Sequence, residues 1–168
     1  MDPGIVPWEA WIRGTALSAF VLHHWWVWPM METLHYFGLS LLLGTVGLFD
    51  LRVMGLAKAI PPAALHRLAP LGVAAWLLNL LTGIVFISGF PDQYAYNHAF
   101  HFKLVFMAVA GLNVVAFYSG PFRRVRAMGP GDDAPRAAKL MAGVSLSAWV
   151  AVLVCGRLLT FFRPPFFH

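Results

Sequence analysis

The chain has 168 residues, of which 60% are hydrophobic and only 11% are charged, and its mean hydropathy is +0.70. These values exclude a soluble domain with a polar surface and indicate an integral membrane protein. The formal net charge of +5 therefore predicts no nucleic-acid binding, because basic residues of a membrane protein lie in loops and set its orientation. The single cysteine, Cys155, excludes a disulfide within the chain and a zinc or iron–sulfur site built from cysteines.

Residues 1–29 are predicted to lie on the membrane surface. Within them, residues 7–22 place apolar side chains such as Trp8 on one face and Glu9 and Arg13 on another, which is typical of an interfacial amphipathic helix. The tryptophan-rich segment HHWWVWP follows, and its rings suit the headgroup level. The chain begins without the basic segment and apolar core of a secretory signal, so we expect the first membrane helix to direct insertion.

Residues 30–168 contain four uncharged apolar segments. At ~1.5 Å rise per residue, each segment with its flanking residues is long enough to cross a ~30 Å hydrocarbon layer. The predicted membrane helices cover about residues 30–56, 63–89, 97–119 and 135–162. The sequence therefore predicts an all-α fold, a four-transmembrane-helix bundle preceded by an N-terminal interfacial amphipathic helix.

Lysine and arginine are distributed unevenly among the loops. The connection between the first and second predicted helices, counted with the helix ends beside it, holds three: Arg52, Lys58 and Arg67. The connection between the third and fourth, counted in the same way, holds five, which are Arg123, Arg124, Arg126, Arg136 and Lys139, and the connection between the second and third holds none before Lys103. The positive-inside rule then places both chain ends outside the cytoplasm, on the periplasmic side of a bacterial inner membrane.

His35 lies in the first third of the first predicted span, where the hydrocarbon offers an imidazole no water, so it indicates a functional site. In the predicted orientation, His98, His101 and Arg157 come to a similar depth near the outer side. We interpret this as a b-type haem site with His35 and His101 as axial ligands. Gly38, one turn after His35, would leave room for the porphyrin, and Arg157 would hold a propionate.

The same residues allow other interpretations. Glu32 with His35, and His98 with His101, have the three-residue spacing that places two ligands on one helical face, which would suit iron, copper or zinc. His35 could instead form a hydrogen bond between helices, relay protons or contact a quinone, and Arg157 could extend to the outer headgroups. Lys103 likewise could either hold an anionic group or extend to the headgroups.

Further polar residues are given structural roles. We expect Asp50 and Arg52 to form an ion pair at the inner interface. The glycines of the first helix, among them Gly44 and Gly47, remove side-chain bulk where another helix or a flat ligand approaches closely.

Several segments together resemble an uncharacterised family of small bacterial four-helix membrane proteins, and they read ETLHYFGLSLLLGTVGLFDLRVMGL, LTGIVFISG, YAYNHAFHFKLVF, GLN and SLSAWVAVLVCGRL. The resemblance covers nearly the whole chain and implies an architecture without an activity. It reaches positions His35, Gly38, Asp50, Arg52, Gly83, Asn97, Phe100, Lys103, Trp149, Gly156 and Arg157. Histidine is not expected at positions 98 and 101 across that family, which weakens a bis-histidine site for the family and leaves it open for this chain.

The sequence thus favours a cytochrome-b-like electron carrier between the quinone pool and a periplasmic redox partner. One alternative is a non-catalytic membrane subunit of a larger respiratory or photosynthetic complex. Another is a membrane protein with a copper, iron or zinc site. The expected partners are the lipid bilayer and either other membrane or periplasmic redox subunits or further copies of the chain. A transporter is disfavoured, since the chain shows no duplicated half.

Overall fold

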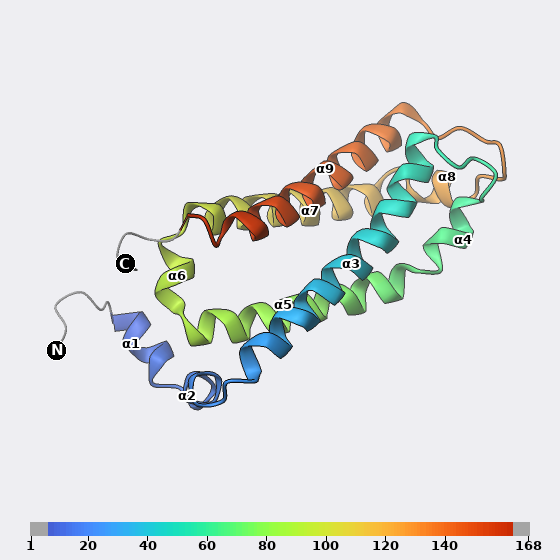
Figure 1. Ribbon diagram of the computed structural model, residues 1–168. Coiled ribbons are helices and arrows are strands. Elements are labelled where there is room, and N and C mark those ends of the chain that lie inside the picture. Colours follow the sequence, from blue (N-terminus) through green and yellow to red (C-terminus); the bar gives the residue numbers. More distant parts are fainter. Residues whose placement is uncertain (1–6, 163–168) are drawn as a thin grey trace.

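A computed structural model describes residues 7–162, and its regular elements in that range are all α-helices. Four helices are long and apolar enough to cross a membrane. They are α3 (Val27–Met54), α5 (Ala69–Gly89, which continues the span begun by α4, Pro62–His66), α7 (His98–Ser119) and α9 (Arg136–Leu158). The predicted all-α four-helix membrane bundle is therefore confirmed (Figure 1).

The remaining helices are short and lie at the ends of the bundle. The predicted interfacial helix is divided in two at Thr15, whose hydroxyl accepts a hydrogen bond from the Ser18 amide at 3.2 Å and so starts a new helix. Arg13 pairs with Asp92 at 2.7 Å and ties this N-terminal region to the connection between α5 and α7. The short helices are α1 (Pro7–Arg13), α2 (Ala16–His23), α6 (Pro91–Ala95) and α8 (Phe122–Arg126).

The four membrane helices form two pairs, α3 with α5 and α7 with α9, and the pairs meet mainly where α3 packs on α9. Figure 1 shows α6 bridging the pairs at one end and the region of α8 and the following loop at the other. Helices α5 and α7 have almost no direct contact. The bundle is consequently open on the side between α5 and α7.

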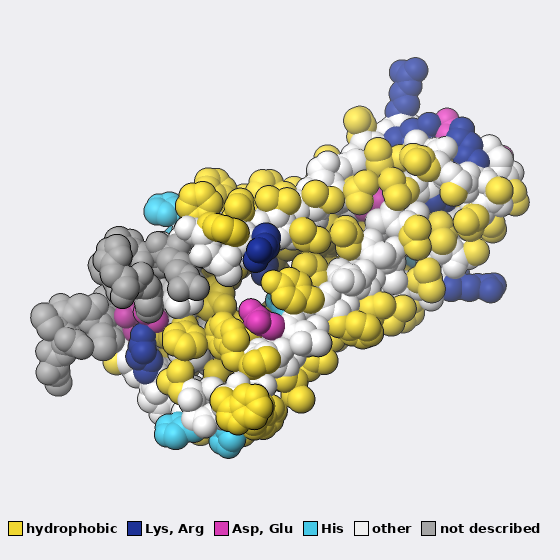
Figure 2. All heavy atoms as spheres, in the orientation of Figure 1, with side chains coloured by type: hydrophobic (Ala, Val, Ile, Leu, Met, Phe, Trp, Pro, Cys, Tyr) yellow, Lys and Arg dark blue, Asp and Glu magenta, His cyan; other side chains and the backbone are white. Residues whose placement is uncertain are grey.

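Apolar side chains cover most of the surface of the bundle, while Lys and Arg side chains gather at the end formed by α8 and its following loop (Figure 2). The connection between α3 and α4 and the connection between α8 and α9 meet there. The Gly131 amide donates to the Lys58 carbonyl at 2.8 Å, and Asp133 accepts from both Lys58 and Lys139. Hydrogen bonds from Lys139 and Lys58 hold the pKa of Asp133 below its usual value, so the carboxylate stays charged at neutral pH.

The side chain of Arg52, on α3, forms hydrogen bonds with both of these connections. Its side chain is almost fully buried, and its guanidinium donates to the carbonyls of Ile60, Gly129 and Asp132. The predicted ion pair with Asp50 is wrong, because Arg52 is bound to these carbonyls while Asp50 faces the interior of the bundle. Two residues apart on a helix, the two side chains point in different directions.

Gly38 allows the close approach of α3 and α5. A Cβ atom at this position would lie 2.6 Å from the Asn79 Nδ2 and 3.2 Å from the Ala75 carbonyl oxygen. We expect Gly38→Ala to lower the free energy of unfolding by about 1–3 kcal/mol, since it overpacks this contact. Thermal unfolding in detergent, followed by circular dichroism, measures the change.

Gly44 supplies the matched control on the same helix, because a Cβ atom there would meet nothing within 4 Å. Gly44→Ala should be neutral or stabilise the protein by up to about 1 kcal/mol through higher helix propensity. Equal destabilisation by both variants would show that the helix contact does not depend on Gly38.

Candidate functional site

The half of the bundle that contains α6 brings together polar side chains from facing helices around His35 of α3. The His35 Nδ1 lies 2.7 Å from the Thr82 Oγ1 of α5, and its ring packs edge-on against Phe86 at 5.5 Å between centroids. Thr82 itself is buried. The α3–α5 packing at Gly38, one turn further along, holds the two helices close enough for this bond.

The hydrogen-bond network assigns the protonation of the imidazole. We assign the Thr82 hydroxyl proton to the Leu78 carbonyl, which lies 2.8 Å away, and in this assignment the Thr82 oxygen accepts a hydrogen bond from His35. The proton of a neutral imidazole is then on Nδ1, and Nε2 carries a free lone pair. Within residues 7–162, Nε2 has no hydrogen-bond partner. His35 thus presents an available ligand nitrogen.

Lys103 of α7 places a positively charged side chain near this imidazole. It interacts electrostatically with His35. Its ammonium lies 3.9 Å from the position that a Cβ atom of Gly156 would take, which is an ordinary contact distance, so the lysine reaches α9. The surroundings of His35 therefore come from Thr82 and Phe86 of α5 and from Lys103 of α7, whose cation could bind an anionic group.

The other residues predicted to contact a haem make different contacts in this structure. His101 is exposed and donates its Nε2–H to the Ala95 carbonyl at 2.7 Å, with the exposed His98 ring 6.3 Å away. Arg157 is also exposed, and its guanidinium lies over the Phe161 ring at 5.4 Å. The space freed by Gly38 is filled by α5, so this glycine has a packing role and does not provide room for a porphyrin.

The alternative metal site is not assembled. In the part of the chain that the structure describes, no three His, Cys, Asp or Glu side chains gather as a metal site. The set Glu32, His35, His98 and His101 therefore does not converge, because Glu32, His98 and His101 are exposed on the ends of their helices while His35 faces α5.

Sequence reasoning missed Thr82 altogether and left Lys103 between a lipid-headgroup contact and an anion contact. A threonine in an apolar helix usually bonds to its own backbone, as Thr82 also does, and carries no visible signal of a partner. Lys103 stood out only as a charge near the start of an apolar segment. Comparison of the chain with protein-family models, with curated proteins and with solved structures finds no match, so the geometry around His35 is the basis for a functional proposal.

Proposed function

We propose that this protein is a membrane electron carrier that holds a b-type haem through His35. The observation that supports this proposal most directly is the His35–Thr82 hydrogen bond, which leaves Nε2 as a free ligand nitrogen. Histidine ligands of metals typically donate their other ring proton to an oxygen acceptor, which fixes the tautomer and the ring orientation. A bound haem would supply one-electron redox chemistry at this place.

The surroundings fit a haem only in part. Lys103 would offer a cation to a propionate, a role that we expected for Arg157. His101 remains the proposed second axial ligand, and for this its Nε2 would have to exchange the Ala95 carbonyl for the iron. In the proposed orientation the arginine-rich end of the bundle faces the cytoplasm of a bacterium, both chain ends are periplasmic, and electrons pass from the quinone pool to a periplasmic partner.

Visible spectroscopy of the detergent-purified protein, as isolated and after addition of haemin, tests the proposal. Wild type should show a Soret band that shifts and sharpens on dithionite reduction. His35→Ala should abolish this spectrum, and His101→Ala should change the axial ligation. His98→Ala is the matched control, because His98 is exposed on the same turn as His101 but is not a proposed ligand. A colourless wild type that takes up no haemin would contradict the proposal.

A non-catalytic membrane subunit is the second candidate, and the exposure of α7 favours it. In the most apolar 18-residue stretch of α7, only 6% is buried within the chain, compared with 28–39% in the corresponding stretches of the other three spans. A helix with so little cover within its own chain is suited to packing against another membrane subunit. For this candidate we expect a colourless preparation and a stable complex with other membrane proteins after mild solubilisation.

A further inference from the structure

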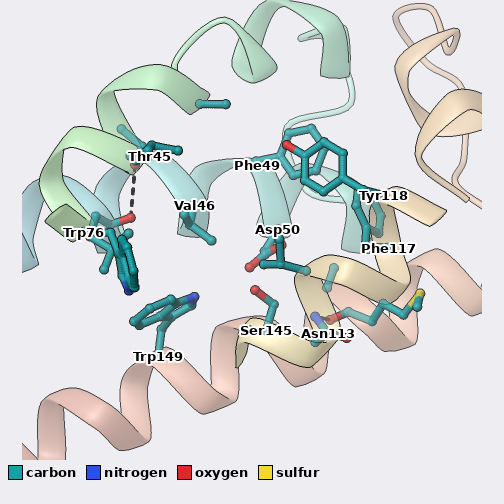
Figure 3. A pocket seen from close by; sticks show the side chains of 18 of the residues that line it. Thr45, Val46, Phe49, Asp50, Trp76, Asn113, Phe117, Tyr118, Ser145 and Trp149 are labelled. Carbon is teal, nitrogen blue, oxygen red and sulfur yellow. Dashed lines mark hydrogen bonds between the residues drawn. The ribbon is translucent and has the colours of Figure 1, made fainter. Parts of the chain in front are cut away.

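A second site lies in the opposite half of the bundle, toward α8. It is a cavity of about 380 Å³ between α3, α5, α7 and α9 (Figure 3). Along α3, His35 and the cavity residue Asp50 are fifteen residues, or ~22 Å, apart. The cavity is lined partly by exposed residues of α5 and α7, including Val73 and Val114, where these helices have almost no contact. It is therefore accessible sideways to a molecule dissolved in the lipid.

Asp50 of α3 is the polar group that distinguishes this cavity from a packing gap. Its side chain is only 6% exposed, and the Ser145 hydroxyl lies beside the carboxyl group, but the Asp50 Oδ2 has no hydrogen-bond partner among residues 7–162. Figure 3 shows the carboxyl group directed toward Ser145 of α9, beside the open space. A buried carboxyl oxygen without a partner is costly in free energy, so a partner supplied from outside the chain would stabilise it.

Trp149 of α9 supplies a second unmatched group. The residue is 9% exposed, and its Nε1–H has no hydrogen-bond partner within the part of the chain that the structure describes. In Figure 3 the ring nitrogen is directed to the side of the cavity where Asp50 and Ser145 approach each other. An unmatched donor and an unmatched oxygen thus line the same cavity, and one ligand group could satisfy both.

Hydrogen-bonding capacity limits the chemistry of that group. The Trp149 Nε1 can only donate, so the ligand must accept from it. An ammonium group cannot accept a hydrogen bond from Trp149. A carbonyl group can accept from Trp149, but it can pair with Asp50 only when the carboxyl group is protonated. A hydroxyl group both donates and accepts, and it matches Asp50 whether the carboxyl group is ionised or protonated.

The walls of the cavity indicate what carries the hydroxyl. Aromatic rings from all four helices line it, including Phe49, Trp76, Phe117 and Trp149. Such walls favour a flat aromatic ligand, and the volume is in the range of small-molecule sites. We propose that this cavity binds the reduced, hydroquinone form of a lipid-soluble quinone. Its role as the electron donor rests on the proposed electron-carrier function, whereas the binding itself does not require a haem.

Ligand comparison on the wild-type protein is the primary test. The probes are a short-tailed benzohydroquinone, the corresponding quinone, and the di-O-methyl ether, which keeps the ring but has no hydroxyl donor. Binding is followed by quenching of tryptophan fluorescence and by the rise in unfolding temperature in detergent. We expect the hydroquinone to bind about tenfold more tightly than the ether. Equal binding of the hydroquinone and its ether would overturn the proposal.

Three variants test the position of the site. Asp50→Leu and Trp149→Phe should each weaken hydroquinone binding about tenfold. Thr45→Val is the matched control, because Thr45 also lines the cavity but its hydroxyl already donates to the Leu41 carbonyl at 2.8 Å. Unchanged hydroquinone binding by both Asp50→Leu and Trp149→Phe would show that these groups do not hold the ligand.

A steric pair tests the cavity without removing a polar group. Gly111 lines the cavity and Gly143 does not, and a Cβ atom at either position would meet nothing within 4 Å. Gly111→Leu should therefore abolish hydroquinone binding, whereas Gly143→Leu should retain it. His35→Ala should also retain hydroquinone binding, because the cavity does not include His35. A protein without haem would therefore still bind the hydroquinone, and failure of the haem proposal can be distinguished from failure of the hydroquinone proposal. Retained binding in Gly111→Leu would place the ligand outside the cavity.

Discussion

Arg52→Met is expected to lower the free energy of unfolding by about 3 kcal/mol or more. The wild-type guanidinium is 1% exposed and donates to carbonyls of two separate connections, at Ile60 and at Gly129 and Asp132. Hydrogen bonds from a charged group contribute about 1.5–3 kcal/mol each, and their loss would leave partly buried carbonyl groups without these donors. Thermal or denaturant unfolding in detergent, followed by circular dichroism, measures the loss.

Arg136→Met is the matched control, since Arg136 is an exposed arginine at the start of α9, at the same end of the bundle. We expect its effect to stay within about 0.5 kcal/mol. Arg52→Lys should be intermediate, because a lysine keeps the charge but lacks the planar fork that reaches several acceptors. If Arg52→Met and Arg136→Met were equally stable, the carbonyl contacts of Arg52 would not hold the two connections together.

The four membrane spans could be predicted because each is recognisable from its amino-acid composition alone. A run of uncharged apolar residues of membrane length has few alternative structures, so the predicted first helix at 30–56 and the observed Val27–Met54 differ by only a few residues. The second predicted helix, 63–89, is interrupted between His66 and Ala69. Pro70 lies at the start of α5, where its missing N–H and fixed φ favour a new helix start.

The site was predictable only where a single residue is unusual in its own segment. His35 stands out because an imidazole is rare in a membrane span. The Thr82 contact depends on the register between α3 and α5, and neither helix encodes that register in its local pattern. The cavity at Asp50 depends on the separation of α5 from α7, which follows from the packing of the two helix pairs. We paired Asp50 with Arg52 because they are close in the sequence, but the sequence alone did not tell us that their side chains point to different sides of α3.

Thr82→Val is expected to weaken haem retention by about 10–100-fold if His35 is the axial ligand as proposed. The valine keeps the shape of the side chain but removes the oxygen that accepts from the His35 Nδ1, at 2.7 Å in the wild type. Loss of the group that orients a metal-ligating histidine typically has an effect of this size, because the tautomer and the ring angle are no longer fixed. The ratio of haem to protein after purification, and the haemin concentration needed to restore the Soret band, measure the change.

Thr82→Ser separates the hydrogen bond from the packing. Serine keeps the hydroxyl that accepts from His35 and donates to the Leu78 carbonyl, and it removes only the methyl group, so its haem content should stay close to that of wild type. A loss of haem in Thr82→Ser as large as in Thr82→Val would assign the effect to packing. Full haem content in Thr82→Val together with loss in His35→Ala would show that the imidazole binds the iron without its orienting partner, whereas haem retention in both variants would move the ligand to another residue.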